Sequence, residues 1–456
     1  MTFKVVFKIG IKSVFAIIVT KLTKFLAVKI FKGGSTFPGR VALKLDSNIL
    51  NKVSKNYKVI LVTGTNGKTT TTSMIYNVLK ENNFDVITNS TGANMYAGIV
   101  GTFVDNYKFS NKKTKYAVIE VDEANVKFIT EHLTPEVITI TNLFRDQLDR
   151  YGEVYTTLNK ILEGVKKAPS TTLLLNGDES LLVNLDVPNP TKYYGFKVSP
   201  NKDNKVDVNS DAKFCKFCQH PYEYNFITYN HLGDFYCPNC GFKKQPLDYS
   251  MNEILELTPD GSKVKINNSV FTVTQSGLYN IYNALCAYGI AKEFDIKDSV
   301  IENSFIKQDS SFGRQESLNI NGKEVKIILV KNPAGYNQAL DTLCLNTSSF
   351  SSAFLLNDKY ADGRDVSWLW DVNFEKLTNM DIKEVLISGV RKYDMAIRLK
   401  VAGLNPSTFK ISDDFEKLTN DITNCTENKV YVLATYTAMI DFRKYLHSKG
   451  FIEKLW

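Results

Sequence analysis

The most constraining feature of the sequence is a glycine-rich turn at residues 64–70, which directly follows a short apolar segment at 58–62. Glycine is needed where backbone N–H groups approach an anion, and a helix that begins at such a turn adds further N–H donors. Lys68 suits a phosphate and the Thr69 hydroxyl suits Mg²⁺, although the spacing between the glycines is shorter than in the common form of this loop. We predict a strand, a loop and a helix that bind a nucleoside triphosphate through Gly64, Thr65, Asn66, Gly67, Lys68, Thr69 and Thr70.

The rest of the chain alternates between short β-rich segments and helical segments, a pattern typical of parallel α/β sheets. The expected strands are 58–62, 85–88, 116–121, 137–140 and 172–175 in a first block, and 326–330, 353–356, 384–388 and 430–434 in a second block. Apolar residues at helical spacing predict a helix at 278–292. We therefore expect an ATP-binding domain at 46–316 and a Rossmann-like α/β domain at 317–456, with the boundary between Gly313 and Asn321.

The first 45 residues carry nine lysines or arginines and no acidic residue, while the remainder of the chain is nearly neutral. The longest uncharged stretch, Ser13 to Thr20, is far shorter than the roughly 20 residues that span a bilayer. Two interpretations stay open for this basic amphipathic arm. Residues 1–32 lie on an anionic membrane surface or a partner protein, or they pack on their own domain with the lysines in solvent.

Four of the seven cysteines form two Cys-x-x-Cys pairs separated by 18 residues, within an insertion at about 203–248. This spacing predicts a closed four-thiolate zinc site with a structural role, formed by Cys215, Cys218, Cys237 and Cys240. Regular structure is expected to resume near Ile254. Thiolate ligands suit a reducing compartment, so we expect a cytoplasmic protein. The isolated Cys286, Cys344 and Cys425 are expected to be small core residues.

The segment GTNGKTT at 64–70 resembles the Mur ligase family, ATP-dependent enzymes that join an amine to a carboxylate. Four further segments carry the resemblance in family order, namely 120–123, 141–149, GLYNIYNALCAYG at 277–289 and 313–316. The resemblance implies that Glu120 and Thr69 hold Mg²⁺, that Asn280 and Asn283 lie on the adenine side, and that Arg314 reaches the γ-phosphate. The implied fold is a Mur ligase ATPase domain with an inserted zinc ribbon.

Some positions depart from the family pattern. Gln147 and Tyr279 stand where relatives have histidine, so a second Mg²⁺ site and the carbamylation of Lys160 stay open. The short segment ahead of the ATPase block has no room for the UDP-binding domain of many relatives. We therefore expect an acceptor that is not held through UDP.

Within the family, the segments 355–375, 388–403 and 434–439 resemble the synthetase subunits of lipid II isoglutaminyl synthases. The resemblance implies amidation of the α-carboxylate of D-glutamate in the stem peptide of lipid II to D-isoglutamine. It also implies a heterodimer with a GatD-like glutaminase, in which an aspartate of this chain serves the partner's active site. The candidates are Asp358, Asp362, Asp365 and Asp371, of which we favour Asp365; the alternative is an aspartate that caps the following helix.

The chemistry of amide formation supports the same function. A carboxylate does not react with ammonia at neutral pH, so ATP must first convert it to an acyl phosphate, with Lys68, Glu120 and Arg314 balancing the charge. The chain offers no evident Cys–His pair for glutamine hydrolysis, which indicates a separate ammonia source. Lys331, at a predicted strand end, is a candidate contact for the acceptor.

Two other functions remain as alternatives. A folylpolyglutamate-synthase-like ligase would share the phosphate loop but would need neither an ammonia source nor a zinc ribbon. A zinc-ribbon ATPase that binds nucleic acid is less consistent with the near-neutral body of the chain. We expect no nucleic-acid partner.

Overall fold

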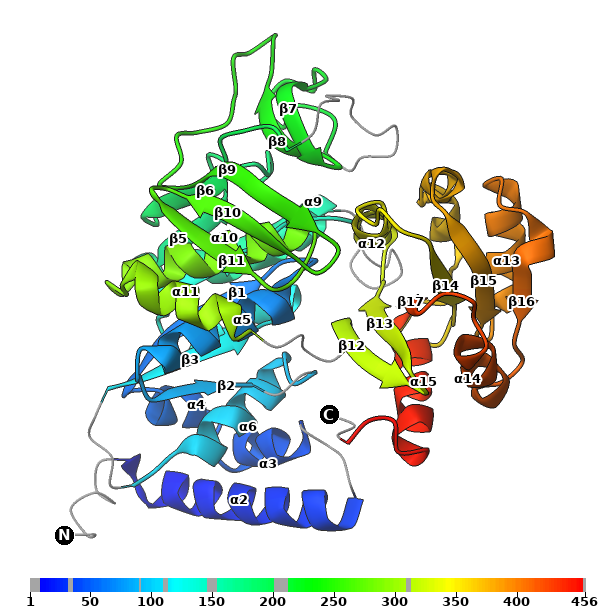
Figure 1. Cartoon of the computed structure of the whole chain (residues 1–456). Helices are drawn as coiled ribbons and strands as arrows, with labels where there is room; N and C mark the ends of the chain where they lie inside the picture. The colour runs from blue at the N-terminus through cyan, green and yellow to red at the C-terminus, as the bar shows by residue number, and fades with distance from the viewer. Residues whose placement is uncertain are drawn as a thin grey trace.

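The computed structural model describes residues 9–31, 36–89, 92–109, 114–145, 154–200, 212–308 and 313–453. They form two α/β domains side by side, and a small ribbon projects from the first domain (Figure 1). The predicted α/β class and the order of the two blocks along the chain agree with this architecture. Residues 146–149 of the segment 141–149 lie outside the described part of the chain, and the other segments used for the family resemblance lie within it.

The first domain is built on a mostly parallel sheet, in which nine strands are described in the order β11-β10-β9-β6-β5-β4-β1-β3-β2. The strands are β1 (Tyr57–Thr63), β2 (Val86–Thr88), β3 (Lys115–Glu120), β4 (Val137–Ile140), β5 (Thr172–Asn176), β6 (Thr191–Phe196), β9 (Tyr249–Thr258), β10 (Gly261–Ile266) and β11 (Ser269–Val273). The five strands predicted for this block are present. Strand β6 was not predicted, because its buried half is short and its first half is only partly covered.

Alternate residues of the central strand β1 face two different cores. Ile60 and Val62 pack with α5 (Lys68–Glu81), α10 (Leu278–Glu293) and α11 (Asp298–Ile306). Val59 and Leu61 pack on the opposite face. The helices of that face are α2 (Ile11–Phe31), α3 (Phe37–Leu45), α4 (Ile49–Val53), α6 (Tyr96–Asn106), α7 (Val126–Thr130) and α9 (Val154–Val165). A strand covered on both faces is apolar throughout, which explains the continuous run in β1.

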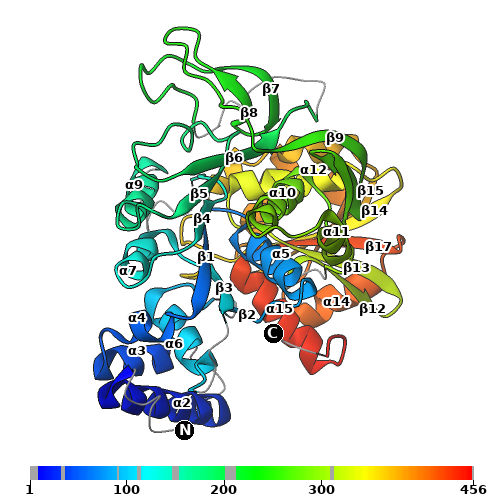
Figure 2. The ribbon, with the colours of Figure 1, turned by 90° about the vertical axis from the view of Figure 1, so that its left-hand side faces the viewer.

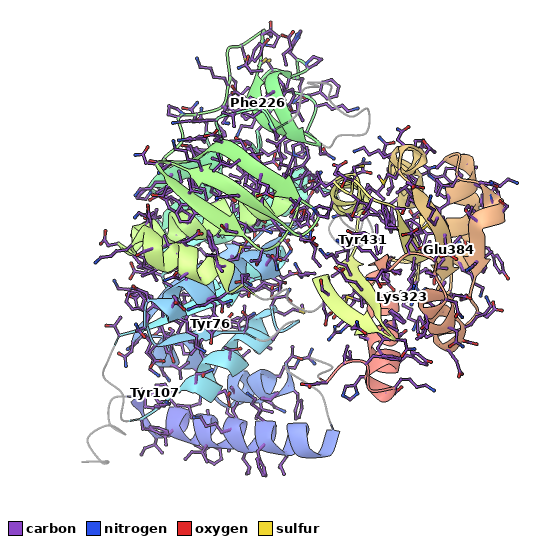
Figure 3. The ribbon with its side chains drawn as sticks, viewed as in Figure 1. Tyr76, Tyr107, Phe226, Lys323, Glu384 and Tyr431 are labelled. Atoms are coloured by element: carbon purple, nitrogen blue, oxygen red, sulfur yellow. The ribbon has the colours of Figure 1, made fainter. Side chains whose placement is uncertain are left out.

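The basic N-terminal segment is partly folded into this core. Helix α2 packs against α3 and α6, with Ala16 and Ile17 fully buried. Ser13 donates a hydrogen bond of 2.7 Å to Asp46, and Lys21 donates one of 2.7 Å to the carbonyl of Tyr107. Tyr107 is labelled near one end of α2 in Figure 3. The described part of the arm thus packs on its own domain. Among the described residues, no helix has both the length and the apolar character needed to cross a membrane.

The second domain contains a six-stranded sheet in the order β12-β13-β17-β14-β15-β16, parallel except for the β12–β13 hairpin. Its strands are β12 (Arg314–Ile320), β13 (Lys323–Leu329), β14 (Phe350–Leu355), β15 (Ile382–Ser388), β16 (Phe409–Ile411) and β17 (Lys429–Ala434). Its helices are α12 (Pro333–Leu343), α13 (Lys392–Val401), α14 (Phe415–Thr423) and α15 (Tyr436–Ser448). The predicted division at 316/317 falls inside β12, because Arg314 already pairs with Ile328.

The ribbon is a hairpin of β7 (Glu223–Tyr229) and β8 (Leu232–Tyr236) between β6 and β9. It lies at the end of the first domain opposite α2 (Figure 2). Regular structure therefore resumes earlier than the predicted Ile254, since β9 begins at Tyr249. Among the isolated cysteines, Cys286 and Cys425 are buried as expected. The prediction is wrong for Cys344, which is exposed because it lies at the C-terminal cap of α12.

Candidate functional site

The loop after β1 has the backbone shape that its glycines predict. Gly64 and Gly67 have φ values of +121° and +82°, which side-chain-bearing residues rarely adopt. A Cβ at Gly64 would lie 2.5 Å from Thr141 Oγ1, and one at Gly67 would overlap Asn283 Oδ1. The neighbouring segment holds the loop, because Asn66 N donates to Asn142 Oδ1 at 2.9 Å. The loop is therefore preformed at the N-terminus of α5.

Four side chains predicted for phosphate and Mg²⁺ chemistry come together at this loop. Thr69 Oγ1 donates a hydrogen bond of 2.7 Å to Glu120 Oε2, and Arg314 Nη2 donates one of 2.9 Å to Thr69 Oγ1. Lys68 forms an ion pair of 2.7 Å with Glu123. Burial lowers the pKa of Arg314, while the nearby Glu120 carboxylate opposes that change. Arg314 thus brings a poorly hydrated cation from β12 of the second domain to the loop of the first.

Thr69 and Glu120 fit a Mg²⁺ ion. Their oxygens are the hard ligands that Mg²⁺ prefers, and few protein ligands suffice because this ion retains several waters. Glu120 is held in position by Asn94, whose Nδ2 donates to Glu120 Oε1 at 3.1 Å. The backbone N–H of Glu120 also donates to Asn89 Oδ1 at 2.9 Å.

The two asparagines predicted for the nucleotide lie in series along the first turns of α10. Thr71 Oγ1 donates to Asn283 Oδ1 at 3.0 Å, which ties the helix of the phosphate loop to α10. Asn283 Nδ2 donates to Asn280 Oδ1 at 3.0 Å, and Asn280 Nδ2 donates to the carbonyl of Ser276 at 2.8 Å. Tyr279, the departure from the family pattern, receives a hydrogen bond of 2.6 Å from Gln315, and burial raises its pKa to about 12.

A cavity of about 440 Å³ lies between the two domains. The phosphate loop, Glu120, Asn280, Asn283 and Arg314 line it from the first domain and from β12. Residues of the second domain also line it, including Lys331, Gly335 and Gln338. The predicted position of Lys331 at a strand end beside the site is thus observed.

Sequence reasoning missed several residues that shape this cavity. Asn142 supports the loop, Glu123 binds Lys68, and Asn332 of the second domain exchanges side-chain hydrogen bonds with Asn66. Asn142 and Glu123 lie in the segments 141–149 and 120–123 that resemble the family, so a role at the phosphate loop could have been predicted for both residues. No sequence pattern near Asn332 predicts its pairing with Asn66, because the two residues are 266 positions apart in the chain.

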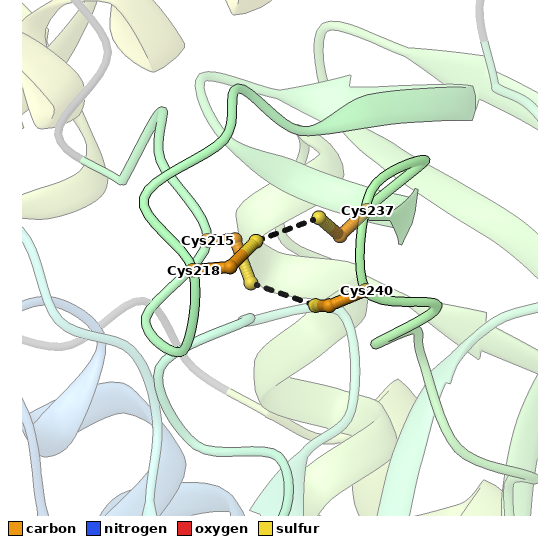
Figure 4. A group of neighbouring side chains, drawn as sticks. All are labelled: Cys215, Cys218, Cys237 and Cys240. Atoms are coloured by element: carbon orange, nitrogen blue, oxygen red, sulfur yellow. Dashed lines mark hydrogen bonds between the residues drawn. The ribbon is translucent and has the colours of Figure 1, made fainter.

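The thiols of the four paired cysteines point toward one another (Figure 4). The Sγ atoms lie within 4.8 Å of one another, with 3.6 Å between Cys215 and Cys240 and 3.4 Å between Cys218 and Cys237. A tetrahedral zinc ion with Zn–S bonds of about 2.3 Å separates its sulfurs by about 3.8 Å, so the cluster fits zinc.

The two halves of the cluster repeat one local structure. Each Cys-x-x-Cys turn is closed by a backbone hydrogen bond to its first cysteine, from Gln219 N to Cys215 O at 2.8 Å and from Gly241 N to Cys237 O at 3.0 Å. The donor residue has positive φ in both turns, at 60° and 74°. The backbone is therefore shaped to aim all four thiols at one point.

The four candidate aspartates have different surroundings. Asp358 pairs with Arg391, while Asp362 is buried and accepts from the backbone N–H of Thr437 at 2.7 Å. The favoured Asp365 is exposed and accepts from Ser367 N at 2.8 Å and Ser367 Oγ at 2.9 Å. The Ser367 N–H and hydroxyl lower the pKa of Asp365. Asp365 is thus an ionised surface carboxylate that accepts hydrogen bonds from the first residue of the short helix Ser367–Asp371, whose N-cap is Val366. Asp371, the last residue of that helix, is partly exposed.

Gln147 lies outside the described residues. Lys160 lies on α9 and is partly exposed, and its carbamylation stays a prediction.

Two family models match the chain. The Mur ligase middle domain model matches residues 62–242, and the MurT ligase C-terminal model matches residues 329–439. The chain is 42% identical to the protein named lipid II isoglutaminyl synthase (glutamine-hydrolyzing) subunit MurT of Streptococcus pneumoniae, over 92% of this chain and 94% of that protein. It is 36% identical to the subunit of the same name from Staphylococcus aureus, over 85% and 87% of the two chains.

A solved structure shares the fold at low sequence identity. The pseudomurein peptide ligase type C of Methanothermus fervidus superposes with a TM-score of 0.67 at 20% identity, over 88% of this chain and 80% of that chain. The identity and coverage of the curated relatives, together with the two family matches, show that the chain belongs to the Mur ligase family, within its MurT branch.

Proposed function

We propose that the protein is the synthetase subunit of a lipid II isoglutaminyl synthase. It uses ATP and ammonia to convert the α-carboxylate of D-glutamate in the stem peptide of lipid II into the amide of D-isoglutamine, a step in peptidoglycan synthesis. The observation that carries the proposal is the gathering of Lys68, Thr69, Glu120 and Arg314 around one interdomain cavity in a chain that matches the MurT subunit of Streptococcus pneumoniae over 92% of its length.

The reaction proceeds in two balanced steps. A carboxylate oxygen of the acceptor bonds to the γ-phosphorus of ATP, and the bond from that phosphorus to the β–γ bridging oxygen breaks, giving an acyl phosphate and ADP. Ammonia then attacks the acyl carbon with its lone pair. The C–O bond to the phosphate breaks, phosphate leaves, and the nitrogen loses a proton to give the amide.

The chain's own contribution is positioning and charge. Lys68 and Arg314 face the site of the phosphates, while Thr69 and Glu120 would hold Mg²⁺, which would offset the charge of the phosphate oxygens. Asn280 and Asn283 border the nucleotide, and Lys331 faces the acceptor from the second domain. No residue of this chain forms a covalent intermediate in this scheme.

Ammonia comes from a GatD-like glutaminase bound to the second domain. Helix α13 and the short segment before it carry a row of exposed apolar side chains, Val390, Tyr393, Ile397 and Val401, with exposures from 56% to 62%. The loop that contains Asp365 is tied to this helix by the ion pair of Asp358 with Arg391. An apolar face beside an ionised carboxylate supports docking of the partner here, with Asp365 completing its active site.

The substrate is anchored in a membrane, and α2 offers a surface for it. One face of α2 is buried through Ser13, Ala16 and Ile17. The opposite face exposes large apolar side chains at helical spacing, namely Ile11, Phe15, Ile18, Leu22, Phe25 and Leu26, at 44% to 81%. The segment also has lysines and no acidic residue. This composition supports peripheral binding to the anionic inner face of the membrane.

The deciding experiment combines the protein, a glutaminase partner, ATP, glutamine and lipid II, followed by mass analysis of the muropeptide. Conversion of a carboxylic acid to an amide, dependent on both ATP and glutamine, is the expected result. Addition of glutamate instead of an amide nitrogen would favour a folylpolyglutamate-synthase-like ligase. ATP hydrolysis stimulated by DNA or RNA, without any change in lipid II, would favour a nucleic-acid-dependent ATPase.

A further inference from the structure

Gln275 is a buried amide that lines the interdomain cavity and finds no hydrogen-bond partner in the described part of the chain. It lies in the loop between β11 and α10, with 2% of its surface exposed. Neither Oε1 nor Nε2 has a partner among the described residues. Buried polar groups are almost always hydrogen bonded, because an unpaired one loses its hydration without compensation. An unpaired amide at a cavity wall is therefore suited to a ligand that supplies both partners.

The backbone on either side of Gln275 is fixed. Ser276 N donates to Gln315 Oε1 at 2.8 Å, and Gln315 Nε2 donates back to the carbonyl of Ser276 at 2.8 Å. On the other side, Thr274 Oγ1 donates to the carbonyl of Gln308 at 2.8 Å. These bonds fix the backbone at Gln275, although its side-chain amide makes no hydrogen bond to the described residues. A fixed backbone lowers the entropy that is lost when a ligand binds.

The position of Gln275 relative to the phosphate loop suits a nucleotide base. Asn283 meets Gly67 of the loop, and the hydrogen-bond series from Asn283 through Asn280 ends on the carbonyl of Ser276. Asn283 lies five residues after Leu278, where α10 begins, which is a helical rise of about 7.5 Å, and Ser276 and Gln275 precede the helix. Gln275 therefore lies beyond the start of α10, at the opposite end of this hydrogen-bond series from Gly67 of the phosphate loop.

We propose that Gln275 reads the base of the bound nucleotide and selects adenine. Its Oε1 accepts a hydrogen bond from the 6-amino group, and its Nε2 donates to the neighbouring ring nitrogen. An amide pairs with adenine in this way because adenine presents a donor beside an acceptor. Guanine presents two acceptors at the corresponding edge, so Oε1 would stay unpaired. This inference rests on the proposed use of ATP in the cavity.

The test pairs a change in the protein with a change in the ligand. Gln275→Met keeps the length of the side chain and removes both polar atoms. The probes are ATP and purine riboside triphosphate, which lacks only the 6-amino group, and dissociation constants are measured by calorimetry on the full chain. Wild-type protein is expected to bind ATP about tenfold or more tightly than the analogue. Gln275→Met should lose that preference while its affinity for the analogue is unchanged.

The melting temperature distinguishes a role of Gln275 in base recognition from a role in stabilising the fold. Replacing an unpaired buried amide by an apolar group of similar shape is neutral or stabilising. The melting temperature of the ligand-free variant should therefore equal or exceed that of the wild type, while the increase caused by ATP becomes smaller. A lower melting temperature with an intact preference for ATP over the analogue would show that Gln275 serves the fold and would overturn the inference.

Gln338 provides a matched control. It lines the same cavity and is 5% exposed, but its Nε2 already donates to Asp341 at 2.9 Å. Gln338→Met should keep the preference for the 6-amino group. Equal weakening of both ligands by Gln275→Met, or an effect confined to the KM of the lipid acceptor, would overturn the inference. If wild-type protein binds ATP but Gln275→Met retains the preference, this inference fails alone; if it binds no ATP, the proposed function fails as well.

Discussion

Asn66 of the phosphate loop and Asn332 of the second domain exchange two amide hydrogen bonds. Asn66 Nδ2 donates to Asn332 Oδ1 at 3.4 Å, and Asn332 Nδ2 donates to Asn66 Oδ1 at 3.2 Å. Asn332 Oδ1 also accepts from Gly335 N at 2.8 Å and caps α12. A single side chain thus joins the start of a helix in one domain to the loop of the other.

Replacing Asn332 should separate these two roles. Asn332→Ala removes the cap and the interdomain pair, so we expect a loss of about 1 kcal/mol in the free energy of unfolding together with weaker ATP binding. Asn332→Asp keeps a good cap but removes the donor to Asn66, so it should retain stability and still weaken ATP binding. Chemical denaturation and calorimetry measure the two effects. Full ATP affinity in Asn332→Asp would show that the pair does not support the loop.

Lys68 is expected to act on the phosphates, although it forms an ion pair with Glu123. Lys68→Ala should slow amide formation by about 100-fold or more, as loss of a positioned charge typically does. It also leaves Glu123, which is 8% exposed, without its counter-ion.

The double variant Lys68→Ala/Glu123→Gln removes that buried charge. It should regain the stability lost in Lys68→Ala but none of the activity. Lys80→Ala, on the same helix, is the control and should behave as wild type, because Lys80 lies over the Tyr76 ring away from the cavity. Normal product formation by Lys68→Ala would contradict the proposed chemistry.

Zinc should stabilise the ribbon and, through it, the cavity. His231 of the hairpin pairs with Glu179 at 2.7 Å, and Thr228 pairs with Tyr282 of α10 at 2.8 Å. Cys237→Ser should lower the zinc content measured by elemental analysis, reduce the melting temperature and weaken nucleotide binding. The control is Cys344→Ser, at an exposed cysteine outside the cluster. An unchanged metal content in Cys237→Ser would exclude a four-thiolate zinc site.

Asp365 should be needed for glutamine hydrolysis and not for amidation itself. Asp365→Asn keeps an oxygen that accepts from Ser367 N but loses the charge. We expect glutaminase activity of the complex to fall by about 100-fold or more, as for other catalytic aspartates, while amidation with added ammonium salts is retained. Asp381→Asn, at another exposed aspartate of the domain, should have no effect. Unchanged glutamine hydrolysis by Asp365→Asn would rule the role out.

Helix α2 should bind anionic vesicles through its exposed face. The double variant Phe15→Ser/Leu22→Ser should reduce binding to vesicles that contain phosphatidylglycerol by about tenfold or more, measured by sedimentation. Binding of the wild type should weaken as salt is raised, since the lysines are screened. Ile306→Ser, at an exposed apolar residue of α11, is the control. Equal binding by the double variant and the wild type would exclude this surface.

Much of the site could be predicted because many of its functional residues lie in short continuous segments. Gly64 and Gly67 are required by the positive φ of their backbone, which is a local property. Each Cys-x-x-Cys pair lies in one turn that is closed by a backbone hydrogen bond. The apolar strands and the helix α10 follow from periodicity in the same way. For these elements, the residues that determine the structure are neighbours in the chain.

The sequence did not predict contacts between residues that are far apart in the chain. Periodicity could not say which face of α2 would be buried, because that depends on α3 and α6. Nor could it divide the domains at the correct residue, since Arg314 pairs with a strand that follows it.

The sequence by itself therefore determined the phosphate loop, the two Cys-x-x-Cys turns and the order of the α/β elements, because each depends on contacts over a few residues. Only the tertiary structure decided which side chains meet in the cavity. The packing of two domains brings Asn332 to Asn66, and Gln275 is buried with no partner among the described residues. Such pairings, and such absences of pairing, depend on the position of segments hundreds of residues apart, which no local pattern encodes.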